Sequence, residues 1–309
     1  MKIYRNIDEF QKIDFPVVTV GTFDGVHVGH RKIIDKMIKR AAEHDGETVL
    51  ITFHPHPRLV IHPDSKNLKF INTREKKYEL LEKAGIDHLI EIQFTKEFSK
   101  TTSFEFIKKY IVDSIGAKKL VIGYDHHFGK NRLGDFKELY DLGITYGFDV
   151  EKVNAQSVNN INVSSTKIRK ALEEGKIKKA NQLLGYEYSI TGKVVRGNKV
   201  GRKIGFPTAN IDLEDQYKLI TANGVYACRV CWNDSIYQGM GNIGLRPTVN
   251  HSELTIEVNI FGFREEIYGG NSTIYCVDRI RDEIKFANLE LLRQQLIKDR
   301  ETVMGLLND

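Results

Sequence analysis

One stretch constrains the fold of this chain more than any other: Val17 to His30, which reads VVTVGTFDGVHVGH. Its first four residues are mostly β-branched and apolar, which predicts a buried strand. Apolar residues at helical spacing follow Gly29, at Ile33, Ile34, Met37, Ile38 and Ala41. A strand that runs through a glycine-containing turn into a helix is typical of an anion site, because free N–H groups and the helix dipole face the turn.

Two histidines, His27 and His30, stand at the start of this expected helix. They can offer donors or positive charge to a phosphate, but histidines in such places are also simple polar caps. The turn is not a Walker A loop, since Gly-Lys-Ser or Gly-Lys-Thr occurs nowhere in the chain. A phosphate site and a capped helix start are therefore the two interpretations at this point.

Composition narrows the protein class. The 309 residues are enough for two domains, and 41% hydrophobic with 28% charged residues is ordinary for a globular protein. No run of eighteen apolar residues predicts a membrane span, and the first residues lack the apolar core of a secretory signal. Three cysteines are too few for a disulfide framework. We therefore expect a cytoplasmic protein that needs no membrane.

Charge is unevenly distributed along the chain. Residues 1–184 carry 31 Lys and Arg against 25 Asp and Glu, whereas residues 185–309 carry 15 against 16. A basic first half suits small anionic ligands such as ATP or pyrophosphate. Nucleic acid is the weaker alternative, because the lysines are dispersed as on a solvated helix surface. We therefore expect no nucleic-acid partner, and the oligomeric state is left open.

The first half of the chain alternates short apolar strands with helices. Strands are expected at 17–20, 48–53, 88–92 and 120–122, and helices at 30–41, 74–84 and from Ser103 to Gly116. The last helix opens on a capping box at Thr102 and Glu105. Repeated β-α units of this length predict a parallel, open α/β sheet of Rossmann-like type, whose ligands sit beyond the carboxyl ends of the strands.

The pattern changes near Gly185. Two short helices are expected at 166–173 and 177–184, and then strands at 189–195, 224–232, 235–242, 254–261 and 272–280. Glycines and Asn or Asp turns separate these strands, which predicts an antiparallel sandwich or a small barrel. Of the two we expect the barrel, of Greek-key type, with a terminal helix near Leu289. The boundary is therefore placed at 184/185.

Four segments of the first half, in order, resemble the FAD synthetase family of nucleotidyltransferases: GTFDGVHVGH, TFHPHPR, GYDHHFGKNRLGD and VSSTKIRKAL. The resemblance implies that the first and last segments hold the ATP phosphates and that the middle two help to form the adenine and flavin pocket. His27 and His30 would then be catalytic, and Asp125 and Phe128 would bind flavin. The implied ATP and phosphate ligands are Gly21, Phe23, Asp24, Gly29, Ser164, Ser165, Thr166 and Arg169.

The second half resembles the riboflavin kinase family through GKVVRGNKVGRKIGFPTANI, NIGLRPTV, TIEVNIFGF and RIRDEIKF. The resemblance implies that Thr208 and Asn210 bind Mg²⁺ and phosphate, with Gly201 and Gly205 in the phosphate cradle. Glu257 would be the catalytic base and Arg281 would lie near the flavin. From the strand pattern alone, the favoured interpretation of Glu257 is a residue that faces solvent.

The chain departs from the usual family pattern at Thr22, where Asn is common, and at His126, where Phe is usual. Asn259 and Gly262 replace a more usual His and Asp. The whole resemblance implies a bifunctional flavin-synthesis enzyme of the prokaryotic riboflavin kinase/FAD synthetase family. Such an enzyme would use Mg²⁺ and act on ATP, riboflavin and FMN. The alternatives are a kinase with a degenerate first module, or a non-catalytic regulator that binds flavin or RNA.

Overall fold

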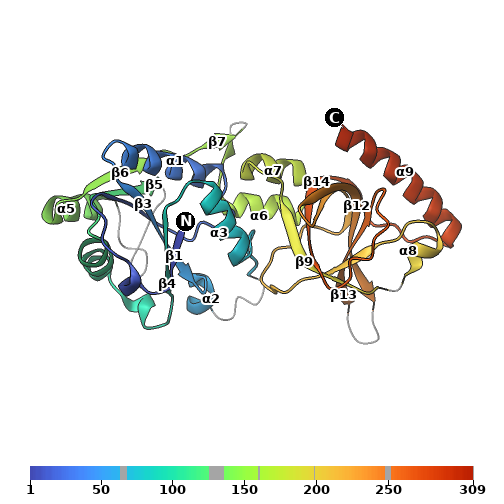
Figure 1. Cartoon of the computed structure of the whole chain (residues 1–309), viewed down its shortest axis with the longest axis horizontal. Coiled ribbons are helices and arrows are strands. Elements are labelled where there is room, and N and C mark those ends of the chain that lie inside the picture. The colour runs from blue at the N-terminus through green and yellow to red at the C-terminus, as the bar shows by residue number, and fades with distance from the viewer. Residues whose placement is uncertain (63–67, 125–135, 159–160, 198, 248–251, 309) are drawn as a thin grey trace. The chain divides into compact units, whose positions relative to one another are not determined.

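The computed structural model describes residues 1–62, 68–124, 136–158, 161–197, 199–247 and 252–308. The chain divides into two compact units, Met1–Ser165 and Thr166–Asp309. Figure 1 colours the first from blue to light green and the second from light green to red. Within these ranges, no helix combines the length and the apolar character that a membrane crossing requires.

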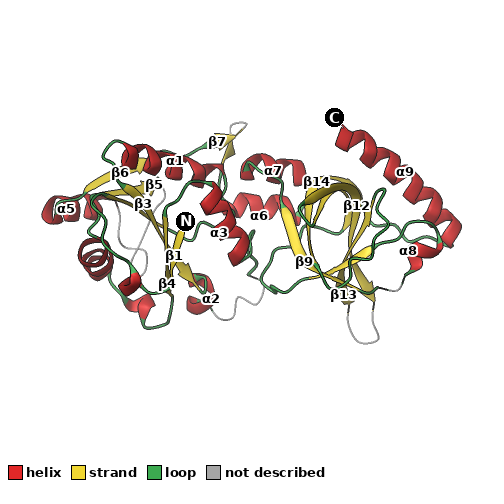
Figure 2. Ribbon diagram, in the orientation of Figure 1, coloured by secondary structure: helices red, strands yellow, loops and turns green. Residues whose placement is uncertain are grey.

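The first unit is built on a six-stranded sheet in which all neighbouring strands are parallel, in the order β1-β4-β3-β2-β5-β6 (Figure 2). Its strands are β1 (Lys2–Tyr4), β2 (Pro16–Val20), β3 (Glu47–His54), β4 (His88–Gln93), β5 (Lys119–Gly123) and β6 (Asp149–Val153). Its α-helices are α1 (Val28–Ala42), α2 (Pro57–Ile61), α3 (Arg74–Lys83), α4 (Ser103–Phe106) and α5 (Phe136–Tyr146). The smaller elements are the 3-10 helices η1 (Ile7–Glu9) and η2 (Phe98–Lys100), the π-helix η3 (Ile107–Ile115) and the strand pair β7 (Ser157–Val158) and β8 (Ile161–Asn162). The predicted parallel α/β fold is confirmed.

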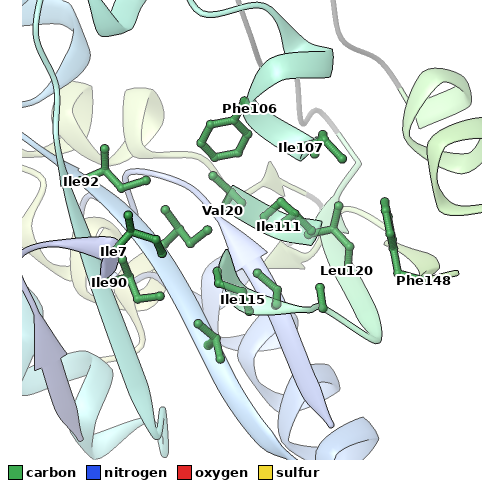
Figure 3. Packing of buried hydrophobic residues seen from close by; sticks show 14 of the residues in the cluster. Ile7, Val20, Ile90, Ile92, Phe106, Ile107, Ile111, Ile115, Leu120 and Phe148 are labelled. Carbon is green, nitrogen blue, oxygen red and sulfur yellow. The ribbon is translucent and has the colours of Figure 1, made fainter. Parts of the chain in front are cut away.

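The central strands of this sheet are buried along most of their length because both faces of the sheet are covered. Val18 and Val20 of β2 join one buried cluster, and Val17 joins another, as expected when successive side chains point to opposite faces. Figure 3 shows the first cluster, in which Val20 lies beside the helical segment from Phe106 to Ile115. Each such fully buried aliphatic side chain contributes about 1.5–3 kcal/mol.

Local signals fix the ends of the helical segment α4–η3. The Thr102 side chain accepts from the Glu105 backbone N–H, and the Glu105 carboxylate accepts from the Thr102 N–H, so the predicted capping box is confirmed. The segment ends at Gly116, whose φ of 71° is left-handed and therefore suits glycine.

The second unit contains a closed antiparallel barrel in the order β10-β13-β12-β11-β14-β9. Its strands are β9 (Ser189–Val195), β10 (Ala209–Asp212), β11 (Gly224–Trp232), β12 (Ser235–Pro247), β13 (Ser252–Ile260) and β14 (Asn271–Arg281). Its helices are α6 (Ser165–Glu173), α7 (Ile177–Leu184), α8 (Val200–Lys203) and α9 (Leu289–Asn308). Because α9 packs on β11, β12 and β14, Val303 and Leu307 join a buried cluster with Met240 of β12. The predicted barrel with a terminal helix is confirmed.

The sequence pattern does not predict strand β10. It is only four residues long, and it exists because it pairs with β9 on one side and β13 on the other. Such a strand is set by its partners and carries too few residues for a periodicity.

The division into compact units falls nineteen residues before the predicted boundary. It places the helix pair α6–α7 with the barrel. The contacts explain this, because Asn181 Nδ2 of α7 donates to the Cys276 carbonyl oxygen at 2.8 Å, and the Asn181 side-chain oxygen accepts from the Tyr188 N–H. A functional boundary at 184/185 stays a prediction.

Candidate active sites

The turn after β2 is held in an unusual backbone conformation. Phe23, Gly25 and Val26 all have positive φ, at 49°, 90° and 36°. Left-handed backbone at Phe23 and Val26 costs energy and persists only where the surroundings impose it. One such constraint is Asp24, a buried residue whose Oδ1 accepts the N–H groups of Ile71 at 2.9 Å and Asn72 at 3.4 Å. The turn is therefore anchored to the segment that leads into α3.

His27 and His30 form a close pair at the start of α1. Their rings stack with centroids 3.7 Å apart, and His27 Nδ1 caps the helix by accepting from the His30 N–H at 3.3 Å. A Cβ on Gly29 would lie 3.1 Å from the His27 ring, so the glycine leaves room for this ring. Capping and a phosphate site are thus not exclusive: His27 caps the helix and still brings the two rings together.

The His30 ring is held neutral. Burial and, to a lesser extent, the neighbouring His27 keep the pKa of His30 well below its usual value. Its Nδ1 atom is buried and has no hydrogen-bond partner among the residues that the structure describes. A neutral imidazole with an open nitrogen can exchange a hydrogen bond with a ligand, but it supplies no permanent charge.

This protonation state predicts a pH-dependent stability. The unfolded chain binds a proton at His30 near the ordinary pKa of about 6.5, and the folded chain does not, so stability falls as the pH drops below about 6.5. The slope from His30 is at most about 1.4 kcal/mol per pH unit. Chemical unfolding at pH 7.5 and 5.5 measures it, with His30→Gln as the comparison. A wild-type protein and variant with the same slope would contradict this assignment.

The last phosphate segment of the first half reaches this turn through Ser165. Its Oγ donates to the Asp24 carbonyl oxygen at 2.9 Å, and Ser165 is also the first residue of α6. Ser164 is half-buried beside it. Thr166 is exposed and Arg169 half-buried on α6, which belongs to the second compact unit.

Gly21, directly after β2, lies close to an aromatic ring. A Cβ on Gly21 would lie 3.0 Å from the Phe23 ring, which itself packs on His30 at 4.7 Å between centroids. Asp125, Phe128 and the unusual His126 lie outside the described residues.

In the second unit, three polar side chains form a row across neighbouring strands. Glu257 of β13 stands opposite Asn210 of β10 on one side and Asn242 of β12 on the other. Directly opposed residues present their side chains to the same face of a sheet. Thr208, just before β10, donates from Oγ1 to Glu257 Oε2 at 3.1 Å. Glu257 is thus half-buried and hydrogen-bonded, which overturns the solvent-facing alternative.

Glu257 and Asn242 of this row line a cavity of about 320 Å³. The polar side of its lining includes Thr208, Asn242, Glu257, Arg281 and Glu283. The remaining lining is largely apolar and comes from the barrel, from residues 284–286 and from α9: Val225, Met240, Ile284, Phe286, Leu292 and Leu296. A cavity with one polar and one apolar side suits a planar aromatic ligand that carries a polar chain.

Two glycines of the predicted phosphate cradle leave no place for a larger residue. At Gly201 the neighbouring backbone comes too close for a side chain, and at Gly205 the backbone conformation favours glycine. A Cβ on Gly201 would lie 2.2 Å from the Phe206 carbonyl oxygen, and Gly205 has a φ of 85°. Gly201 lines the cavity, whereas Gly205 and Asn210 are not among the described residues that line it. The Asn210 amide packs instead against Gly197, where an added Cβ would lie 2.2 Å from its nitrogen.

Asn259 has a structural role that the sequence did not reveal. Its Nδ2 donates to the Pro207 carbonyl oxygen at 2.6 Å, next to Thr208, and its side chain also lines the cavity. The residue is buried. This contact fixes the backbone that presents the Thr208 hydroxyl.

Arg281 reaches the cavity from the end of β14, where α9 holds its guanidinium. Its Nε and Nη2 donate to the Asp299 carboxylate at 2.9 and 2.6 Å. The same carboxylate also accepts a hydrogen bond from Gln295 Nε2 at 2.8 Å. The sequence analysis missed Asp299. A signal existed, because Asp299 occupies the same helical stripe as Leu292, Leu296 and Val303.

Loss of the Arg281–Asp299 ion pair is expected to lower the stability of the protein strongly. Asp299 is only 3% exposed, and removing one partner of a buried ion pair leaves an uncompensated charge. We expect Asp299→Ala to lower the free energy of unfolding by about 3 kcal/mol. Urea unfolding measures it, with the exposed Glu301→Ala on the same helix as control. Equal losses in both variants would refute a stabilising role for the pair.

Comparisons with known proteins agree with this division of sites. A family model described as FAD synthetase matches residues 11–167, and one described as riboflavin kinase matches residues 184–307. The first range includes the histidine pair and the second includes Thr208 and Glu257. Residues between the two models fall in the helix pair α6–α7.

Several relatives match over nearly their whole length. Proteins named bifunctional riboflavin kinase/FMN adenylyltransferase from Buchnera aphidicola and Listeria monocytogenes are 36% and 38% identical, covering 100% and 95% of this chain and 99% and 93% of their own. A crystal structure from Streptococcus pneumoniae, described as a macrolide-efflux protein, is 32% identical, covers 98% of both chains and has a TM-score of 0.89. The two domain matches and the relatives' names favour the two-activity interpretation over its alternatives.

Proposed function

The chain belongs to the family of bifunctional riboflavin kinases/FMN adenylyltransferases, and on this premise we propose which of its residues serve each activity. Its riboflavin kinase domain converts riboflavin and ATP into FMN and ADP, and its FAD synthetase domain converts FMN and ATP into FAD and pyrophosphate. We assign residues 1–184 to the second activity and residues 185–309 to the first. The family-model limits at 167 and 184 support this assignment.

For adenylyl transfer, we assign the turn 21–30 and the segment 164–169 to the ATP phosphates. An FMN phosphate oxygen attacks the α-phosphorus as the bond to pyrophosphate breaks, so the protein needs no nucleophile. It must orient both substrates and stabilise the charge that shifts onto pyrophosphate. The paired rings of His27 and His30 at a helix N-terminus support this role. Asp125 and Phe128 stay proposed flavin ligands.

For phosphoryl transfer, we assign Glu257 as the base that accepts the proton of the ribityl 5′-hydroxyl while that oxygen attacks the γ-phosphorus of ATP and the bond from this phosphorus to ADP breaks. One observation carries this assignment: the hydrogen bond from Thr208 to Glu257 inside a cavity with a polar and an apolar side. The apolar side would receive the flavin ring, with Arg281 at its edge. Gly201 and Gly205 would leave the backbone open to phosphate.

The donor groups near Glu257 fit Mg²⁺. The Thr208 hydroxyl and the Asn210 amide oxygen are hard oxygen ligands, which suits this ion. Asn210 stands directly opposite Glu257, and Thr208 bonds to it, so both donors flank one carboxylate. When bound, Mg²⁺ neutralises and orients the transferring phosphates.

Removal of the metal is therefore expected to stop both activities. With excess EDTA, we expect FMN and FAD formation to fall to background and to return when Mg²⁺ is added in excess. Thr208→Ala should raise the Mg²⁺ concentration needed for half-maximal kinase rate and leave that for adenylyl transfer unchanged. An unchanged Mg²⁺ requirement of the kinase in Thr208→Ala would argue against this ligand.

The direct test of the function incubates purified protein with riboflavin, ATP and Mg²⁺ and resolves the flavins by chromatography. We expect FMN first and FAD afterwards. FMN without FAD would contradict the adenylyl-transfer assignment, and bound flavin without product would contradict both. We also propose small molecules as the main partners and a cytoplasmic location, where the free thiols of Cys228, Cys231 and Cys276 stay reduced.

A further inference from the structure

Thr208, a proposed ligand of Mg²⁺, lies just outside a strand ladder. β10 begins at Ala209, which stands opposite Val258 of β13, and Pro207 and Thr208 precede this pairing as the structure describes it. Pro207 lacks the backbone N–H that could extend a ladder. The position of the Thr208 hydroxyl therefore depends on contacts other than strand pairing.

Asn259 provides such a contact. Its Nδ2 atom donates to the Pro207 carbonyl oxygen at 2.6 Å, and the residue is only 7% exposed. Its backbone lies within β13, where it stands opposite Met240 of β12. A donor that projects from a paired strand has a fixed position, so the Asn259 amide does for Pro207 what a ladder hydrogen bond does elsewhere.

The hydrogen bond to Pro207 also orients Thr208. The peptide unit from the Pro207 carbonyl to the Thr208 nitrogen is planar, so fixing its oxygen fixes the direction in which Thr208 starts. From there the Thr208 Oγ1 donates to Glu257 Oε2 at 3.1 Å. Glu257 precedes Asn259 by two residues on the same strand, so both side chains point to one face of β13. One strand thus holds the Thr208 region twice, through its backbone and through its hydroxyl.

Pro207 itself is exposed, which separates this contact from ordinary core packing. Without the Asn259 amide, the Pro207 carbonyl can turn to water and pair there. Loss of the contact should therefore displace the Thr208 segment more than it destabilises the barrel.

We propose that Asn259 is a positioning residue for phosphoryl transfer, whose side-chain amide fixes the peptide between Pro207 and Thr208 and so holds the Thr208 hydroxyl toward Glu257 and Mg²⁺. The proposal rests on the assignment of Thr208 and Glu257 to the kinase reaction. Asn259 also lines the cavity, and its effect on the reaction is assigned to Thr208 because its Nδ2 donates to the residue next to it.

Asn259→Leu in the full chain tests this, because it removes the amide and keeps a side chain of similar size. We expect it to lower kcat for FMN formation by about tenfold to a hundredfold, the usual effect of removing a partner that orients a metal ligand. Combined with Thr208→Ala it should add less than about twofold, because two changes that act through one group are not additive. Calorimetric titration of Mg²⁺ with ADP present, where no turnover occurs, should show about tenfold weaker binding in Asn259→Leu.

Ser272→Ala is the matched control. Ser272 is a buried residue of the same barrel, and its Oγ donates to the Cys231 carbonyl oxygen at 3.0 Å. It is not among the described residues that line the cavity. The control thus loses a buried bond from a side chain to the backbone, as Asn259→Leu does, and should change neither kcat nor Mg²⁺ binding.

Independent, multiplying losses in the double variant, or an unchanged Mg²⁺ affinity in Asn259→Leu, would overturn the proposal. Asn259→His retains an N–H donor and should keep most of the activity. It decides the question if circular dichroism shows that Asn259→Leu is unfolded: a folded Asn259→His protein as impaired as Thr208→Ala would refute the role of the donor. A wild-type protein that forms no FMN would instead refute the kinase assignment, so the two failures are distinguishable.

Discussion

Glu257→Gln is expected to reduce riboflavin phosphorylation by about a thousandfold in kcat, while the same chain still converts supplied FMN into FAD. A general base contributes about 10²–10⁴-fold, and glutamine keeps the size of the side chain but cannot accept the proton. The amide can still pair with the Thr208 hydroxyl, so the local fold should persist. Initial rates of FMN formation from riboflavin, with saturating ATP and Mg²⁺, measure the effect.

Two comparisons sharpen this test. Glu266→Gln changes an exposed carboxylate beyond β13 and should leave both activities unchanged. FAD formation from supplied FMN reports whether Glu257→Gln leaves the first unit intact. A variant that retains more than a tenth of the wild-type kinase kcat would exclude Glu257 as the base, and the carboxylate would then serve only to orient Thr208.

His30→Ala is expected to reduce FAD formation by about a hundredfold or more and to leave FMN formation unchanged. The ring packs between His27 and Phe23 at the start of α1, and its open Nδ1 is the atom best placed to bond a ligand among the buried groups described for this unit. Loss of one preorganised donor to a developing charge typically costs about 10²–10³-fold. Assays with FMN and ATP as the only substrates measure it.

His27→Ala should give a similar loss with an added fall in stability of about 1 kcal/mol, because His27 also caps α1. His44→Ala is the matched control, since His44 stacks on Phe15 just after the same helix. Riboflavin phosphorylation should be equal in all three variants. A His30→Ala protein that forms FAD at the wild-type rate would limit this pair to capping.

Motif and local structure agree closely in both halves. The segment from Val17 to His30 is the strand, turn and helix that its pattern predicts, and α9 begins at the Leu289 that opens the expected terminal helix. These elements follow from information within a few residues, namely periodicity, caps and glycines. Asp125 and Phe128 stay predictions from the family resemblance, as does the Mg²⁺ role of Thr208 and Asn210.

The sequence by itself determined the elements with a clear periodicity, the change from α/β to barrel, and the segments that carry chemistry. Only the tertiary structure decided what surrounds those segments. Asp24 accepts the backbone N–H of Ile71 from 47 positions away, and Asp299 fixes Arg281 from the next helix. Strand β10 exists through its two neighbours. The physical reason is that local patterns report which face of an element is apolar, whereas a buried charge is set by the distant group that compensates it.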